Sequence, residues 1–224
     1  MQCKSHAPTP TITTKHTDHS EPLNCHKCKD FFVNYIDIDH LELEQKSKEQ
    51  SDSKLWHDAC KLRLTASSVK KVSVRDTTNP DNFLRERLFP SFRGNHATQH
   101  GKDSEPMALK EPAELGHPTV KVGTVLSASE PWLSASPDGI IDKNGKDVLI
   151  EVKCPLVTSE SLTDMFEAGK SVFDVHLIDG KPVLKRNGAR GYFLQLQVGM
   201  YCTETTNGKF FVWTKDTHVL LDIE

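Results

Sequence analysis

Two acidic residues on either side of a predicted β-hairpin, Asp138 and Glu151, have the clearest chemistry in this chain. Between them stands Asn144-Gly145, a pair typical of a two-residue hairpin loop. The flanking runs, residues 140–142 and 148–154, are rich in β-prone residues and predict two strands. A two-residue loop at this point sets Asp138 opposite Glu151, and side chains so paired have Cβ atoms roughly 4.5–5.5 Å apart.

The same register sets Ile141 opposite Val148, and the two-residue period of a strand puts Lys153 on the same face as Glu151. Two carboxylates held opposite each other repel unless a cation lies between them. Carboxylate oxygens suit Mg²⁺ or Mn²⁺. Two acids and a lysine on one face therefore indicate metal-assisted hydrolysis of a phosphodiester. The alternative is that these are ordinary turn and strand-end residues, although charges in so apolar a strand must be paired or bound to a metal.

The composition fits one sizeable domain with extensions. The chain has 224 residues, 36% of them hydrophobic, a net charge of −3 and a mean hydropathy of −0.50. No apolar run approaches the ~20 residues of a membrane span, and the start of the chain has no signal-peptide pattern. Six scattered cysteines do not resemble a disulfide scaffold. We therefore expect an intracellular protein, with the nucleus as one location, and no contact with a membrane.

Residues 1–54 are predicted to form a polar, mostly irregular extension and linker with one helix over 31–48, and residues 55–224 a globular domain. Within the extension, four residues have spacings that allow a zinc site: Cys3, His6, Cys25 and Cys28. Little apolar sequence surrounds them, so free thiols in an irregular tail are the alternative.

In the globular part, the expected helices span residues 56–64, 66–72, 80–89, 96–115, 159–169 and 191–203, and the expected strands span 119–127, 132–134, 140–142, 148–154, 172–185, 209–214 and 218–223. Pro106 and Pro112 are expected to break or kink the fourth helix. This order predicts an α/β domain with a mixed β-sheet flanked by helices on both faces.

A basic stretch lies near the start of that domain. Residues 61–93 hold eight Lys or Arg against three Asp or Glu, so they could follow a phosphate backbone or form a solvated helix face. Thr65 is a good N-cap for the helix expected over 66–72, whose first turn carries Ser67 beside Arg63. A helix N-terminus with hydroxyls binds anions, and ordinary capping is the alternative.

With these residues in hand, the chain resembles the lambda-exonuclease-like (YqaJ-type viral recombinase) family of PD-(D/E)XK nucleases. Five segments carry the resemblance in the right order: Trp56 with Arg63-Leu-Thr-Ala-Ser67, Gly101-Lys-Asp-Ser-Glu105, Ser134-Ala-Ser-Pro-Asp-Gly139, Glu151-Val-Lys-Cys-Pro155 and Tyr192 to Met200. They cover roughly residues 55–215. The resemblance implies a restriction-endonuclease-like core, and the mostly irregular N-terminal extension precedes the segments that carry it.

The resemblance also implies an activity. Members of this family degrade DNA, typically double-stranded DNA from a 5′ end, with Mg²⁺ or Mn²⁺, in recombination or repair. DNA ends would be the partner, and family members can assemble as trimeric rings. An endonuclease with the same core is an alternative.

Carried over by position, the resemblance makes Asp138 and Glu151 metal-binding carboxylates, with the carbonyl of Val152 as a further ligand. It gives Lys153 the role of positioning the attacking water or helping to deprotonate it.

The resemblance also assigns supporting roles around these ligands. Glu105 would supply a carboxylate from a helix, and Gln195 would be the helical glutamine that supports the site. Arg63, Ser67 and Ser136 would bind DNA phosphates.

The chain departs from the family pattern at two places. Relatives often carry Arg four residues after the Trp, where this chain has Cys60, so a phosphate contact is lost unless Arg63 replaces it. Arg63 as a surface residue is the alternative. The chain also stops at Glu224, soon after the last predicted hairpin, so a C-terminal helical region would be missing.

Two other function classes therefore stay open. One is a DNA-binding module of the same fold that has lost cleavage. The other is a protein-binding domain in which Glu151 and Lys153 form only a structural pair.

Overall fold

The computed structural model describes residues 38–224 except 73–74, 76, 93, 112–117, 143–144, 157–160 and 171. Its helices are α2 (His40–Lys46), η2 (Gln50–Asp52), α3 (Lys54–Lys61), η3 (Val69–Lys71), α4 (Asp81–Leu88), α5 (His96–Ala108), α7 (Leu162–Glu167) and α8 (Tyr192–Thr203). Its strands are β1 (Leu64–Thr65), β2 (Thr119–Val120), β3 (Val125–Leu126), β4 (Leu133–Ala135), β5 (Gly139–Asp142), β6 (Asp147–Lys153), β7 (Val175–Ile178), β8 (Lys181–Leu184), β9 (Gly208–Trp213) and β10 (His218–Ile223). Outside the described residues lie the turn residue Asn144 and the predicted zinc ligands Cys3, His6, Cys25 and Cys28.

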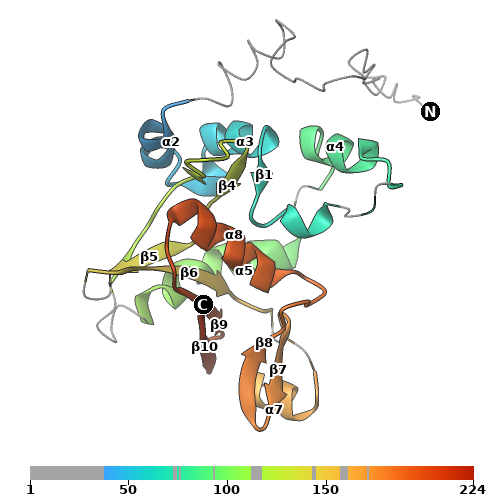
Figure 1. Cartoon of the computed structure of the whole chain (residues 1–224). Coiled ribbons are helices and arrows are strands. Elements are labelled where there is room, and N and C mark those ends of the chain that lie inside the picture. The colour runs from blue at the N-terminus through green and yellow to red at the C-terminus, as the bar shows by residue number, and fades with distance from the viewer. Residues whose placement is uncertain are drawn as a thin grey trace, which may run out of the picture.

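A five-stranded mixed sheet in the order β10-β9-β6-β5-β2 forms the centre of the molecule (Figure 1). The antiparallel hairpin β5–β6 pairs Ile141 with Val148, so the predicted register is confirmed. Gly145 in its turn has a φ of +76°, a conformation that favours glycine. The next strand, β9, runs parallel to β6. This sheet holds β6, which carries Glu151, and β5, which Asp138 directly precedes.

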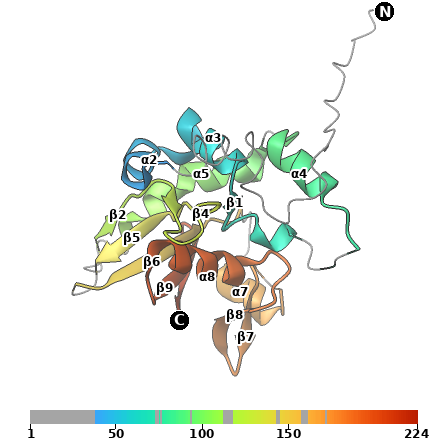
Figure 2. The same cartoon turned by 45° about the horizontal axis from the view of Figure 1, so that its top comes forward.

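Helices cover both faces of this sheet, as the sequence predicts for an α/β fold (Figure 1, Figure 2). On one face Leu149 of β6 packs with Leu196 of α8. On the other face Ile150 packs with Ala108 of α5. A Cβ on Gly199 would stand 2.8 Å from Leu149, so glycine at this position lets α8 lie close to β6. The mixed α/β architecture is therefore confirmed.

A smaller sheet has the strand order β1-β4-β3. Its strand β4 ends shortly before Asp138, the first of the two predicted acids. Leu64 and Thr65 pair with Leu133 and Ser134 in parallel. The prediction of a helix over residues 66–72 is wrong. A turn and the short η3 occupy this stretch instead. The hydroxyl of Ser68 accepts from the N–H of Thr65 and donates to its carbonyl, which closes a turn at the end of β1.

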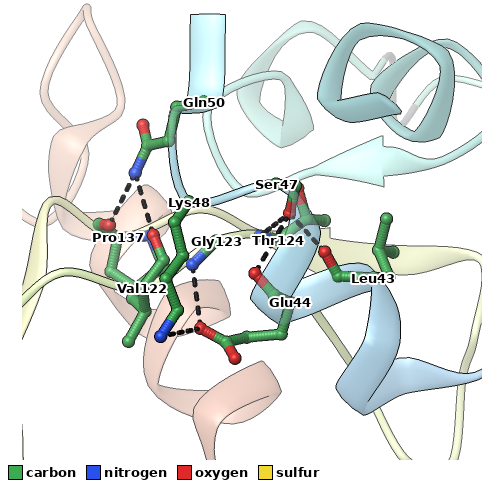
Figure 3. Close-up of polar contacts among 9 residues, drawn as sticks. All are labelled: Leu43, Glu44, Ser47, Lys48, Gln50, Val122, Gly123, Thr124 and Pro137. Atoms are coloured by element: carbon green, nitrogen blue, oxygen red, sulfur yellow. Dashed lines mark hydrogen bonds and ion pairs between the residues drawn. The ribbon is translucent and has the colours of Figure 1, made fainter. Parts of the chain in front are cut away.

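The N-terminal extension, where the structure describes it, packs on this smaller sheet through α2, which lies within the helix predicted over residues 31–48. Leu43 of α2 is buried with Ala59 of α3 and Leu126 of β3. The hydroxyl of Ser47 donates to the carbonyl of Leu43 and accepts from the N–H of Thr124 at 2.8 Å (Figure 3). α2 is therefore fixed to the same body as α3.

The beginning of α8 is held by a buried acid. Asp174 precedes β7, and its carboxylate accepts from the N–H groups of Arg190 and Gly191, both at 3.0 Å. Negative charge at a helix N-terminus is stabilising. α5 runs through Pro106 without ending there. Of the helices described, none combines the length and the apolar character that crossing a membrane requires.

Candidate active site

Asp138 and Glu151 line one cavity of about 240 Å³ beside α8. Asp138 is 9% exposed and Glu151 is 5% exposed. The paired register ends with Gly139 opposite Ile150, and counting one residue further sets Asp138, which precedes β5, across from Glu151. The N–H of Val152 donates to Oδ2 of Asp138 at 2.6 Å, so the main chain of β6 holds this carboxylate in place. The two predicted acids therefore lie on the same side of the sheet.

The charge of Glu151 acts on Asp138. Burial raises the pKa of Asp138 well above its ordinary value, and repulsion from Glu151 raises it further. Lys153 and the N–H of Val152 act in the opposite direction but are outweighed. Lys153 and the N–H of Val152 therefore do not fully neutralise the negative charge of the carboxylates in the cavity. A cation bound there would stabilise both carboxylates.

Glu151 is held by two side chains. Its Oε1 accepts from Nζ of Lys153 and from Nε2 of Gln195, which projects from α8. Nζ of Lys153 also lies 5.2 Å from the centre of the Tyr192 ring. The close packing of α8 on β6 brings Gln195 within reach. The structure brings Glu151, Lys153 and Gln195 together.

Lys153 is positively charged in this environment. Burial lowers its pKa, but attraction from Glu151 and then Asp138 outweighs burial, so the net shift is upward. A lysine with a raised pKa stabilises negative charge and does not act as a general base near neutral pH. Of the two roles that the resemblance allows, positioning the water fits this charge.

Glu105 lies on α5, near enough for its charge to act on the other acids. Burial raises its pKa, Lys153 lowers it, and Glu151 raises it again. It contributes in turn to the raised pKa of Asp138. Its position next to this cluster fits the carboxylate that the resemblance expects from a helix.

Two predicted phosphate-binding hydroxyls, those of Ser67 and Ser136, also line the cavity. The hydroxyl of Ser136 accepts from Nε1 of Trp56 at 2.9 Å, which ties α3 to the loop before Asp138. Ser67 is exposed, and its Oγ lies 3.3 Å from Oγ1 of Thr65. Both hydroxyls therefore stand at the acids, although Ser67 lies in a turn and not at a helix N-terminus.

Arg63 differs from both sequence expectations. It is 3% exposed, so it is neither a surface residue nor part of the cavity wall. Its Nε donates to the carbonyl of Pro131 at 2.9 Å and its Nη1 to the carbonyl of Ala59 at 3.4 Å. Carbonyls at the end of a helix need such donors. The position of Arg63 therefore argues for a structural role.

A second arginine, Arg87, which no sequence motif identifies, is part of the cavity wall. Arg87 of α4 lines the cavity, and its Nη2 donates to the carbonyls of Cys60 and Arg63. Burial raises the pKa of the Cys60 thiol to about 11, so the thiol is neutral and supplies no charge near pH 7. The basic stretch over residues 61–93 was the only sequence signal for Arg87, and it did not single this residue out.

The donor set fits a hard divalent ion that takes further ligands from outside the protein. No three His, Cys, Asp or Glu side chains within the described ranges are grouped closely enough to hold a metal ion. Mg²⁺ does not require such a cage, since it commonly uses one or two carboxylates together with waters and substrate phosphates. Asp138, Glu151 and the carbonyl of Val152 are oxygen donors of this kind.

Comparisons with known proteins identify the family and similar folds. A family model described as the YqaJ-like viral recombinase domain matches residues 45–206. An alkaline exonuclease from Laribacter hongkongensis (LHK-Exo) has a similar structure, with a TM-score of 0.55 and 24% identity over 77% of this chain and 82% of that chain. LHK-Exo in complex with dAMP gives a TM-score of 0.52 and 23% identity over 73% of this chain and 78% of that chain. No curated protein sequence matches the chain. The chain belongs to the family of YqaJ-like viral recombinase domains, as its sequence motifs predicted.

Proposed function

We propose that the protein is a metal-dependent deoxyribonuclease, and specifically an exonuclease that degrades double-stranded DNA from its ends in the 5′ to 3′ direction. The observation that carries the proposal is the pairing of Asp138 and Glu151 in one cavity, with Lys153 bonded to Glu151. Family membership supports the same reaction class. The similar LHK-Exo is an alkaline exonuclease with a dAMP complex, which supports a deoxynucleotide substrate here.

Each residue has a defined task in this proposal. Mg²⁺ or Mn²⁺ held by Asp138, Glu151 and the carbonyl of Val152 would lower the pKa of water and neutralise charge on the phosphate. Lys153 orients the attacking water and stabilises the negative charge that develops during attack. Gln195 fixes the carboxylate of Glu151, so that its free oxygen keeps one direction.

The remaining residues contact the DNA phosphate or change the electrostatic potential at the site. The hydroxyls of Ser67 and Ser136 are placed to donate to phosphate oxygens at the cavity wall. Glu105 adds negative charge next to the two acids and so strengthens cation binding. Recombination or repair of DNA is the process that the family name supports.

The test is cleavage of end-labelled linear duplex DNA by the full chain, with Mg²⁺ and with EDTA. We expect cleavage with Mg²⁺ only. Asp138→Asn and Glu151→Gln should each lose activity about a hundredfold or more, since several kcal/mol of charge stabilisation depend on them. Asp147→Asn is the matched control, because Asp147 is an exposed acid on the same strand as Glu151.

The same assay separates the alternatives. Products from 5′-labelled and 3′-labelled strands give the direction, and cleavage of covalently closed circular duplex would indicate an endonuclease. A wild-type protein that binds DNA and releases no product with Mg²⁺ or Mn²⁺ would be the inactive DNA-binding module. Full activity of Asp138→Asn would refute the assignment of the acids.

A further inference from the structure

The two residues before β7 have a strained backbone. Phe173 has a φ of +51° and Asp174 a φ of +63°, although neither is a glycine. A positive φ is uncommon in a residue with a side chain, and in a bulky residue such as phenylalanine it is an outlier. Strain of this kind persists only where the surrounding structure enforces it, and it is concentrated at functional sites. The contacts of this strained pair are therefore informative.

The carboxylate of Asp174 determines where α8 begins. Asp174 is 6% exposed, and its Oδ2 accepts from the N–H groups of Arg190 and Gly191, the two residues that directly precede α8. Gly191 is in the left-handed conformation at the helix start and has no side chain that could cap the helix. The start of α8 is thus held by a side chain 17 residues upstream of Gly191.

The main chain of Asp174 holds the other end of the same loop. Its carbonyl accepts from the N–H of Lys185 at 3.0 Å, just after β8. A Cβ on Gly188 would stand 2.2 Å from Cγ of Asp174, so the loop closes directly against the carboxylate. β7 and β8 form a hairpin that projects from the rest of the molecule, and this loop leads from it into α8 (Figure 1). Asp174 therefore fixes both ends of the connection.

The ring of Phe173 packs against the same helix start. It lies 5.7 Å from the ring of Tyr192, the first residue of α8, with the two planes at 64°. The guanidinium of Arg190 lies 5.4 Å from the centre of the Phe173 ring. Edge-on aromatic pairs and a cation close to a ring both attract. Both members of the strained pair thus contact the residues at which α8 begins.

This helix start lies one turn from the proposed active site. The N–H of Gln195 donates to the carbonyl of Gly191 at 2.9 Å. The side chain of Gln195 in turn donates to Glu151 in the acid cavity, which is the cavity lined by Asp138 and Glu151. A helix is stiff and rises 1.5 Å per residue, so a displacement of its first turn also displaces a side chain one turn later. Neither member of the strained pair lines the acid cavity itself.

We propose that the strained pair Phe173-Asp174 is a positioning element for the acid cavity, in which the carboxylate of Asp174 sets the start of α8 so that Gln195 meets Glu151. Asp174 contacts neither metal nor DNA and acts through Gln195. The inference rests on the proposed nuclease function, because it is the orientation of a metal-binding carboxylate that the pair maintains. It assigns a function to the strain, whereas a pair that only closes a turn would leave cleavage unaffected.

The first test removes the carboxylate and keeps the backbone. Glycine adopts a positive φ at no steric cost, so Asp174→Gly removes only the side chain. Single-turnover cleavage of linear duplex should slow about tenfold, since small displacements far from the reacting atoms have effects of this order. DNA affinity in EDTA should stay unchanged. Asp174→Asn keeps an oxygen that accepts the same N–H groups and tolerates a positive φ, so its rate should stay within about threefold of the wild type.

Ser161→Ala is the matched control. The Ser161 hydroxyl accepts from the N–H of Asp164 and caps α7, a helix that contributes no residue to the acid cavity. Its loss should lower the Tm without slowing cleavage at a temperature where the variant is folded. Comparison with this control separates loss of a helix cap in general from loss of the one that orients Gln195.

A double-mutant cycle tests the route through Gln195. Asp174→Gly should slow cleavage about tenfold in the wild type but less than about twofold in Gln195→Ala, because residues that act through one another are not additive. Equal factors in both backgrounds would overturn the inference. If Asp174→Gly does not fold at the assay temperature, Asp174→Ser replaces it in the same cycle, since it also lacks the carboxylate.

The outcomes distinguish this inference from the nuclease function. If the wild type cleaves DNA and Asp174→Gly cleaves equally fast, the positioning role is wrong and the nuclease proposal stands. The positioning role is also wrong if Asp174→Asn is as slow as Asp174→Gly. A wild type that does not cleave DNA overturns the nuclease proposal and this inference with it.

Discussion

The N–H of Val152 donates a 2.6 Å hydrogen bond to Oδ2 of Asp138, and so a main-chain atom of β6 holds the acid that precedes β5. The same bond lowers the pKa of Asp138, but burial and repulsion from Glu151 have larger effects in the other direction. The acid is therefore fixed in position and destabilised in its charged form. Such a group is adapted to bind a cation and not to stabilise the fold.

Without a divalent ion, this arrangement should make the fold less stable as pH rises. An acid whose folded pKa is raised binds more protons in the folded state than in the unfolded state, so stability falls between its unfolded pKa of about 3.9 and its higher folded pKa. We expect Asp138→Asn to remove this loss. Urea unfolding in EDTA at a series of pH values measures it as the difference between the wild type and the variant.

That difference should grow with pH from about 4 upward, because the asparagine carries no charge at any pH. Glu105, whose pKa is also raised, repels Asp138, so part of its own pH-dependent loss disappears in the variant and adds to the difference with the same sign. A constant difference at all pH values would contradict the raised pKa of Asp138.

Divalent metal should reverse the destabilisation. A ligand that binds only the folded state stabilises it by about 2.7 kcal/mol at a hundred times its Kd. We expect Mg²⁺ or Mn²⁺ to raise the Tm of the wild type and of Asp147→Asn, but not that of Asp138→Asn or Glu151→Gln. Thermal unfolding with and without the ion measures this. Equal shifts in all four proteins would place the bound ion elsewhere.

Removing the amide that holds Glu151 should reduce turnover more than DNA binding. Gln195→Ala leaves the Oε1 of Glu151 with Lys153 alone and should lower the cleavage rate about 10–100-fold, the usual effect of losing a partner of a metal ligand. Gln197→Ala is the control, because Gln197 lies on the same helix and donates instead to the carbonyl of Glu224. Single-turnover cleavage and DNA affinity are both measured. Equal rates for the two variants would rule out a positioning role for Gln195.

The pairing of the two acids was predictable because strand geometry leaves little freedom. Once a short loop joins β5 and β6, the register follows from counting residues back from the loop on each strand. A shift of one strand by one residue would turn Glu151 to the other face of the sheet. The turn after Thr65 was not predictable in the same way. Serine and threonine hydroxyls satisfy their own backbone in turns about as readily as they cap helices, and Ser68 does the former.

The partners that side chains find far along the chain could not be predicted from the sequence. Arg63 and Arg87 lie in one basic stretch and both donate to main-chain carbonyls, and nothing local shows that only Arg87 also lines the acid cavity. The difference arises from the tertiary position of Arg87, which brings its Nη2 to the carbonyl of Cys60, 27 residues away in the sequence. The same holds for Gln50, whose partners are 72 and 87 residues away.

Cleavage should require the positive charge of Lys153, but Lys153 should not gain or lose a proton during the reaction. Its pKa is raised because attraction from Glu151 and Asp138 outweighs burial, so it stays protonated across the neutral range. Lys153→Met should lose about a hundred- to a thousandfold in rate, as for the loss of one charge-stabilising donor. Lys153→Arg should keep the pH profile of the wild type. A profile whose alkaline limb moves in Lys153→Arg would instead indicate that the lysine titrates during catalysis.

Gln50 connects the N-terminal helical segment to the loop that ends at Asp138. Its Nε2 donates to the carbonyl of Pro137 at 2.9 Å and to that of Val122 at 3.4 Å (Figure 3). Because Pro137 directly precedes Asp138, Gln50→Ala should loosen the acid and lower both stability, by about 1 kcal/mol, and cleavage rate. Gln45→Ala, at an exposed position of α2, is the control.

Two measurements separate the structural effect of Gln50 from its effect on the site. Urea unfolding gives the loss of stability, and single-turnover cleavage at a temperature where both variants stay folded gives the loss of rate. A slower rate at full folding means that Gln50 positions Asp138 through Pro137. A rate equal to that of Gln45→Ala would mean that the N-terminal segment stabilises the fold without shaping the acid cavity.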